Sequence, residues 1–153
     1  DMTLDFDFDK VKEQSKDNPV FYVQYAHVRT KSIIAKAIET IPEAYKKFTA
    51  AEFNLSLLST EEEIQLIKLL ASWPKVLASS AKACEPQRIA YYLIDVASRF
   101  HSIWNLGKEK NDYRFNIEDD IELTASRLAL AESVRKVITG GFSVIGVKPM
   151  DKM

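Results

Sequence analysis

The stretch that decides the fold is residues 85–104, "EPQRIAYYLIDVASRFHSIW", which carries the clearest helical pattern in the chain. Pro86 stands where a helix can begin, because proline is tolerated in the first helical turn. Seven apolar residues follow at intervals of one, three or four: Ile89, Tyr92, Leu93, Val96, Ala97, Phe100 and Trp104. This spacing places them on one face, so it predicts a long helix with one side in a hydrophobic core.

Two further helix starts precede this stretch. Asn18-Pro19 predicts a capped helix that runs to about residue 40. Residues 59–63, "STEEE", contain the capping-box pattern twice, as Ser59 with Glu62 and as Thr60 with Glu63. Both signals favour long helices over strands.

The last third of the chain predicts a loop and one more helix. Residues 106–117 are polar, and Asn116 is expected to cap a helix whose first turn holds acidic residues. Gly140-Gly141 is expected to end that helix. All segments together predict an all-α, antiparallel bundle of four to five helices over residues 18–153.

The composition indicates one globular domain. Its 153 residues are 46% hydrophobic and 28% charged, which excludes a disordered or fibrous chain. The single cysteine, Cys84, cannot form an intramolecular disulfide, which favours an intracellular location. No apolar run predicts a membrane span, and no signal peptide opens the sequence. The absence of an initiator Met suggests a fragment of a longer protein.

The charge distribution is only weakly suited to nucleic acid. Net charge is -1; residues 1–20 hold six acids and three lysines, and the remaining 18 bases stand against 16 acids. A strong basic patch is therefore excluded as the main source of affinity. An RNA ligand would be held by shape, base stacking and a few charges.

No catalytic or metal-binding constellation is visible. His27 and His101 lie on apolar helical faces without partners at metal-ligand spacing, and both are interpreted as core or helix-packing residues. A glycine-rich phosphate loop is also missing. The sequence therefore predicts no catalytic residues, no metal and no cofactor in this chain.

The helix that starts at Asn18 carries the most distinctive candidate site. Tyr22, Tyr25 and Arg29 share one face, whereas Val23 points toward the core. Two phenol rings and a guanidinium form a surface on which unstacked RNA bases can be held. The alternative is that the tyrosines are partly buried, with only their hydroxyl groups exposed.

The string "NPVFYVQYAHVR", Asn18 to Arg29, resembles the start of the C-terminal domain of arginyl-tRNA synthetases. Residues 70–105, residues 126–147 and the ending "KPMDKM" resemble further segments of that family in the same order. The resemblance implies a helical anticodon-binding domain of the DALR type at residues 18–153. Residues 1–17 would link it to a class I catalytic domain.

The resemblance also implies an activity and partners for the full enzyme. That enzyme would join arginine to its tRNA with ATP, in the cytoplasm and as a monomer. This chain would hold the anticodon stem-loop of an arginine tRNA and would be inactive alone, because it lacks the catalytic signatures. Its RNA-binding residues, carried over by position, would be Ser15, Lys16, Asp17, Asn18, Pro19, Tyr22, Tyr25, Arg29 and Met153.

Charge and neighbourhood add three candidate phosphate contacts, Lys16, Lys31 and Lys36. Two other functions stay open at this point. The chain could be the anticodon-binding domain of another class I synthetase, which tRNAs of different identity would distinguish. It could also be a non-catalytic helical module that binds a protein, for which no salt-dependent RNA binding is expected.

Overall fold

A computed structural model of the chain describes residues 18–153, in which every regular element is helical. The elements are α2 (Pro19–Thr40), α3 (Pro42–Thr49), the 3-10 turn η1 (Leu55–Leu57), α4 (Glu61–Ala71), α5 (Trp73–Ala83), α6 (Gln87–Glu109), the 3-10 turn η2 (Asn111–Tyr113) and α7 (Ile121–Val144). The all-α prediction is confirmed for these residues. The predicted linker, residues 1–17, lies outside them, so the domain boundary stays a prediction.

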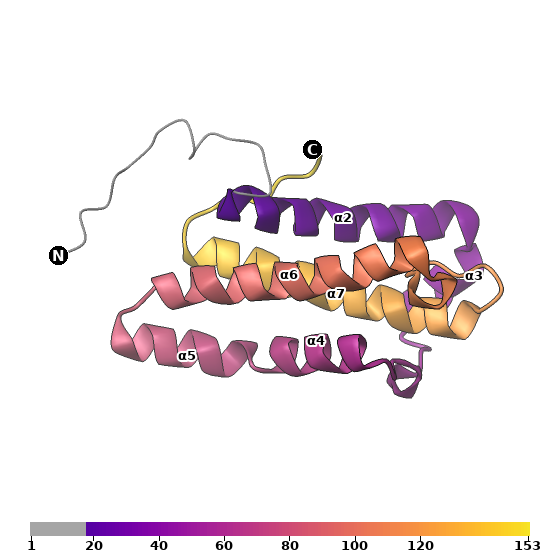
Figure 1. Cartoon of the computed structure of the whole chain (residues 1–153), viewed down its shortest axis with the longest axis horizontal. Coiled ribbons are helices and arrows are strands. Elements are labelled where there is room, and N and C mark those ends of the chain that lie inside the picture. The colour runs from indigo at the N-terminus through magenta and orange to yellow at the C-terminus, as the bar shows by residue number, and fades with distance from the viewer. Residues whose placement is uncertain (1–17) are drawn as a thin grey trace.

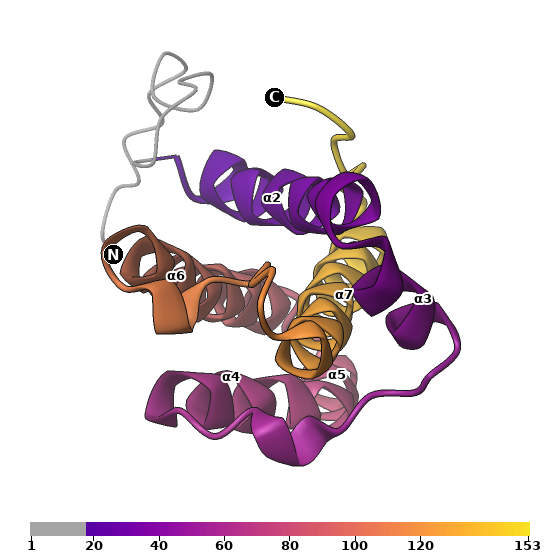
Figure 2. The ribbon, with the colours of Figure 1, turned by 90° about the vertical axis from the view of Figure 1, so that its right-hand side faces the viewer.

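The helices pack in three layers (Figures 1 and 2). α2 forms one outer layer, α6 and α7 form the middle layer, and α4 with α5 forms the other outer layer. α7 runs antiparallel to α6, whereas α2 and α6 run in the same direction (Figure 1). Because α6 lies between α2 and the pair α4–α5, it contacts both outer layers.

The predicted stripe of α6 forms part of the core. Six of its seven residues are buried, and Phe100, Val96 and Ala97 have no exposed surface at all. Trp104 is only half-buried. Trp104 therefore lies at the edge of the core, where its ring contacts Arg29 of α2.

The prediction that Gly140-Gly141 ends the last helix is wrong. α7 continues to Val144, and a Cβ atom built on Gly141 would lie 2.6 Å from Cδ2 of Leu93. Gly141 thus allows α6 and α7 to approach closely. The helix instead ends at Val144, with Ile145 as its C-cap. Gly146 follows with a φ of +73°, which suits glycine, and Val147 N–H donates to the Phe142 carbonyl at 2.8 Å, as in a Schellman motif.

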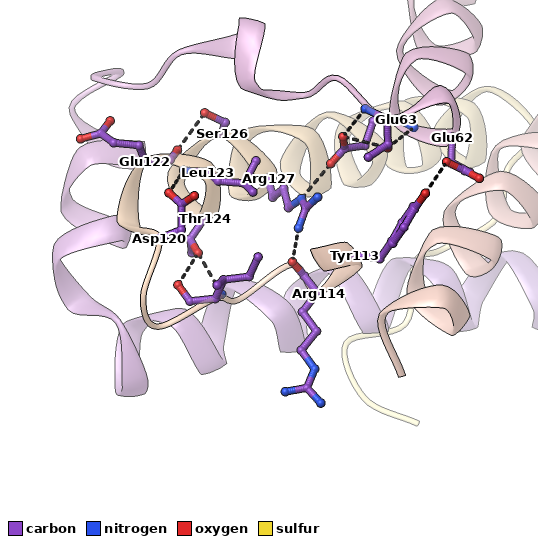
Figure 3. Close-up of polar contacts among 12 residues, drawn as sticks. Glu62, Glu63, Tyr113, Arg114, Asp120, Glu122, Leu123, Thr124, Ser126 and Arg127 are labelled. Carbon is purple, nitrogen blue, oxygen red and sulfur yellow. Dashed lines mark hydrogen bonds and ion pairs between the residues drawn. The ribbon is translucent and has the colours of Figure 1, made fainter. Parts of the chain in front are cut away.

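The predicted caps are partly confirmed. Thr60 and Glu63 form the capping box of α4, whereas Ser59 caps nothing there. For α7 the Asn116 prediction is wrong: Asp120 accepts the hydrogen bond from Leu123 N–H at 2.9 Å (Figure 3). The predicted loop also starts late, because α6 extends to Glu109.

A buried ion pair connects α7 of the middle layer with α4 of the outer layer formed by α4 and α5 (Figure 3). Arg127 of α7 donates from Nε to Glu63 Oε1 of α4 at 2.7 Å, and both side chains are almost fully buried, at 3% and 1% exposure. Arg127 Nη1 also donates to the Arg114 carbonyl at 2.7 Å. One guanidinium therefore fixes α4, α7 and the segment between α6 and α7 to one another.

Candidate nucleic-acid interface

The start of α2 is fixed by Asn18 and Pro19. Asn18 Oδ1 accepts hydrogen bonds from the N–H groups of Val20 and Phe21 at 3.1 and 3.3 Å, and Pro19 is the first helical residue. This cap satisfies donors that a helix start leaves unpaired. The predicted cap is confirmed, while contact of these two residues with RNA stays a prediction.

The face of α2 predicted to hold RNA is distinct from its buried side. Val23 and Ala26 are buried, at 2% and 0% exposure, and Tyr25 is 42% exposed. Tyr22 and Arg29 are half-buried. The three candidate side chains are therefore not sealed in the core, but of the three only Tyr25 is exposed.

Arg29 lies against two aromatic rings. Its guanidinium carbon lies 4.1 Å from the centre of the Tyr25 ring and 4.7 Å from that of the Trp104 ring. Its Nη2 also donates to the Tyr25 hydroxyl. The cation–π contacts and this hydrogen bond hold the planar guanidinium in place and brace the Tyr25 ring against it.

His101 of α6 lies beneath this face. Its ring centre is 4.6 Å from that of Tyr22 and 5.6 Å from that of Tyr25. Nδ1 of His101 lies 3.1 Å from Arg29 Nη1, and Nε2 lies 3.3 Å from the Tyr22 carbonyl oxygen. Because a guanidinium only donates and a carbonyl only accepts, the ring is neutral, with its proton on Nε2.

The environment of His101 favours that neutral form. Burial, opposed in part by the hydrogen bond to the Tyr22 carbonyl and supported by the nearby Arg29 charge, lowers the pKa of His101 to about 4. At neutral pH its Nδ1 is therefore available to accept from Arg29. The histidine holds Arg29 from below, while Tyr25 covers it from outside.

Sequence reasoning missed the role of His101 and Trp104. Both were assigned to core packing because they follow the apolar stripe of α6. The available signal was chemical: both rings carry polar nitrogen atoms, and they stand three residues apart at the end of that stripe. At such a spacing they face the same neighbouring helix.

The C-terminal tail lies along the side of α2 (Figure 1). Gln24 donates from Nε2 to the Lys148 carbonyl at 2.9 Å and accepts from Met150 N–H at 2.8 Å. His27 Nδ1 lies 3.0 Å from the Met150 carbonyl oxygen, so it carries the proton and donates. Its burial lowers the pKa of His27. The prediction that the tail packs back on the bundle is confirmed.

Contacts with the tail also define the roles of His27 and Lys31. His27 is buried under the tail, so it anchors the tail to α2. Lys31 forms an ion pair with Asp151 at 2.6 Å, which competes with its predicted phosphate contact. Met153 is 45% exposed, and its contact with RNA stays a prediction.

Three of the predicted RNA-binding residues, Ser15, Lys16 and Asp17, lie outside the described residues. Within residues 18–153, no group of three potential ligands is arranged to hold a metal ion. In the same range, no helix combines the length and apolar character needed to cross a membrane. The candidate site is the face of α2 where the exposed Tyr25 ring and the Arg29 guanidinium lie together.

Comparisons with known proteins show the family of the chain. Residues 23–153 match the profile of the DALR anticodon binding domain. Proteins named arginine–tRNA ligase from Rickettsia bellii (strain OSU 85-389) and Rickettsia canadensis (strain McKiel) are 64% identical over 151 residues and 65% identical over 153 residues. A crystal structure of a Campylobacter jejuni protein assigned as an arginyl-tRNA synthetase superimposes with a TM-score of 0.74 at 26% identity.

The matches cover nearly all of this chain but only part of each longer protein. They cover 99%, 100% and 97% of this chain, but 26%, 27% and 29% of the three longer proteins. The chain thus spans about a quarter of the length of the curated relatives it matches. It belongs to the family of DALR anticodon-binding domains.

Proposed function

We propose that this chain binds the anticodon stem-loop of an arginine tRNA. The observation that carries the proposal is the stack of Tyr25, Arg29 and Trp104 on the face shared by α2 and α6. Tyr25 offers a ring to an unstacked base, and base–aromatic stacking contributes about 1–3 kcal/mol per base. A loop of single-stranded RNA is the ligand whose bases are free to stack in this way.

The charge of Arg29 supports the same ligand. Among residues 18–153, no carboxylate forms an ion pair with Arg29; its partners are the Tyr25 hydroxyl, His101 and the two rings. Its positive charge is therefore not neutralised by the protein. An RNA phosphate or base edge close to Tyr25 would complete its contacts.

The other residues carried over from the family extend this surface. Tyr22 and the cap residues Asn18 and Pro19 lie at the start of α2, next to Ser15, Lys16 and Asp17 in the chain. Met153 closes the tail that binds along α2. We assign these residues to the edge of the RNA site, with Tyr25 and Arg29 at its centre.

The proposed parent protein is an arginine–tRNA ligase. Its relatives carry that name, and about three quarters of their length lies outside this chain. The catalytic domain, with its ATP and arginine sites, would belong to that part, so this chain would need no cofactor and would not ligate arginine alone. We further propose that the parent protein is a cytoplasmic monomer, since translation takes place there and the RNA site lies within one chain.

The direct test is binding of a fluorescently labelled arginine-tRNA anticodon stem-loop to the 153-residue chain, followed by anisotropy. Binding should weaken with salt, since phosphate contacts release counterions. The matched control is the stem-loop of a tRNA for a different amino acid. Equal binding of both stem-loops would favour another class I synthetase, and absence of RNA binding would favour a protein-interaction module.

A further inference from the structure

A cavity of about 440 Å³ is lined in part by Trp104, whose ring also contacts Arg29 of the proposed RNA site. It is an open cavity, bordered by α2, the end of α6 and residues 113–116. Trp104, Ile33 and Phe115 supply apolar surface, and Lys36, Lys108 and Arg114 supply positive charge. None of its ten lining residues is acidic. We call it the loop cavity.

The wall formed by residues 113–116 is fixed from several sides. Arg127 Nη1 donates to the Arg114 carbonyl at 2.7 Å, and the Arg114 side chain extends away from that contact (Figure 3). Asn116 Nδ2 donates to the Ile33 carbonyl of α2 at 3.1 Å. A Cβ atom on Gly107 would lie 2.9 Å from the Tyr113 carbonyl oxygen, so the segment contacts α6 closely.

A second anchor follows directly. The Thr124 hydroxyl exchanges two hydrogen bonds of 2.9 Å with the backbone N–H and carbonyl of Ile117. Because the wall is held at both ends, the loop cavity exists before any ligand binds. A preformed site of this size lies within the range of about 300–1,000 Å³ that is usual for small-ligand pockets.

The charges of the loop cavity are available to an anion. Lys36, Lys108 and Arg114 are exposed, and within residues 18–153 none of them forms an ion pair. Arg114 makes one weak contact, from Nε to the Gly107 carbonyl at 3.3 Å. Apolar and aromatic surface beside several free cations suits a group that is flat at one end and anionic at the other.

The loop cavity is also adjacent to the proposed RNA site. Trp104 contributes to both, because its ring contacts the Arg29 guanidinium and also lines the cavity. A nucleotide in the cavity would therefore lie on the opposite side of the Arg29–Trp104 contact from a base stacked on Tyr25. The shared Trp104 and the positive charge together favour an RNA occupant over a peptide.

We propose that the loop cavity takes one unstacked nucleotide of the RNA that binds Tyr25 and Arg29. Its base would lie against Trp104 and the apolar surface, and its phosphate would contact Lys36, Lys108 or Arg114. This inference rests on the proposed function, but it assigns a second subsite on the α6–α7 connection. The cavity residues Lys108 and Arg114 fall in the segment for which the sequence offered no role.

The test places a negative charge in the cavity mouth. Ser32 is exposed, lines the cavity, and donates its hydroxyl only to the Val28 carbonyl of the preceding turn. Ser32→Glu should weaken binding of the arginine-tRNA anticodon stem-loop by about tenfold, the effect of losing one charged contact. The matched control is Ser79→Glu on α5, an exposed helical serine with the equivalent hydroxyl contact to Val76, and it should change nothing.

A second pair of variants does not depend on the added charge. Lys36→Ala should reduce the salt dependence of binding by about 0.7 in the slope of log K against log salt. Lys75→Ala on α5, on the opposite side of the bundle from α2 (Figure 1), should leave the slope unchanged. Circular dichroism on all four variants verifies that they fold.

Stem-loops with single abasic positions identify the nucleotide. The abasic position that corresponds to the cavity nucleotide should weaken binding to the wild-type chain. The same abasic stem-loop should bind Ser32→Glu as strongly as the intact stem-loop does. If Tyr25→Ala weakens binding while Ser32→Glu and Lys36→Ala behave like their controls, the cavity proposal is overturned and the proposed function stands. If the wild-type chain binds no stem-loop, both are overturned.

Discussion

Protonation of His101 should destabilise the fold and release Arg29 at acid pH. The neutral ring accepts from Arg29 at Nδ1 and donates to the Tyr22 carbonyl from Nε2. A proton on Nδ1 would remove the acceptor and place two positive charges about 3 Å apart, which is repulsive in a partly buried site. Protonation of His101 is therefore less favourable in the folded state than in the unfolded state.

The size of the effect follows from the pKa of His101. The value of about 4 in the folded chain, against 6.5 for an unperturbed histidine, corresponds to about 3 kcal/mol at most. The unfolded chain takes up its proton below about pH 6.5, whereas the folded chain does so only near pH 4. The contribution of His101 to the free energy of unfolding is thus complete above about pH 6.5 and is lost as the pH falls toward 4. His27 contributes in the same direction, because burial lowers its pKa as well.

The assay is urea unfolding of the wild-type chain and of His101→Gln, followed by circular dichroism. The glutamine amide can both accept from Arg29 and donate to the Tyr22 carbonyl, but it does not titrate. Between about pH 7 and pH 5 the wild type should lose about 2 kcal/mol more than His101→Gln. Equal losses would refute the assignment of a neutral, buried His101.

Two further predictions concern packing. Arg127→Met should destabilise the chain by about 3–5 kcal/mol in urea unfolding, because Glu63 is left charged and buried; the surface variant Lys47→Met is the control, and a similar result for both would contradict this view. Gly141→Ala should cost about 1–3 kcal/mol, since the added Cβ would meet Leu93 at 2.6 Å, and an unchanged midpoint would show that the helices can separate freely.

Local signals in the sequence predicted several helices and their starts. The stripe of α6, the Asn18-Pro19 start and the capping box of Thr60 depend on residues within a few positions of one another. Such interactions can be recognised from spacing alone. The same holds for the arrangement of Tyr25 and Arg29 on one face of α2.

Long-range contacts could not be predicted in this way. Gly141 looked like a helix end, but its role depends on Leu93 of another helix. Asn116 looked like a cap, but its side chain bonds to α2 instead. His101 looked like a core residue because its polar partners lie more than 70 positions away in the chain.

The central claim is that the exposed ring of Tyr25, braced by Arg29, binds the anticodon loop. Tyr25→Ala and Tyr91→Ala provide a matched pair, because Tyr91 is 68% exposed on α6, about 15 Å along the helix from His101 at about 1.5 Å per residue. Anisotropy with the labelled arginine-tRNA stem-loop should show Tyr25→Ala weaker by about 1–3 kcal/mol and Tyr91→Ala unchanged. Equal affinities of the wild type and Tyr25→Ala, with the fold intact, would contradict the claim.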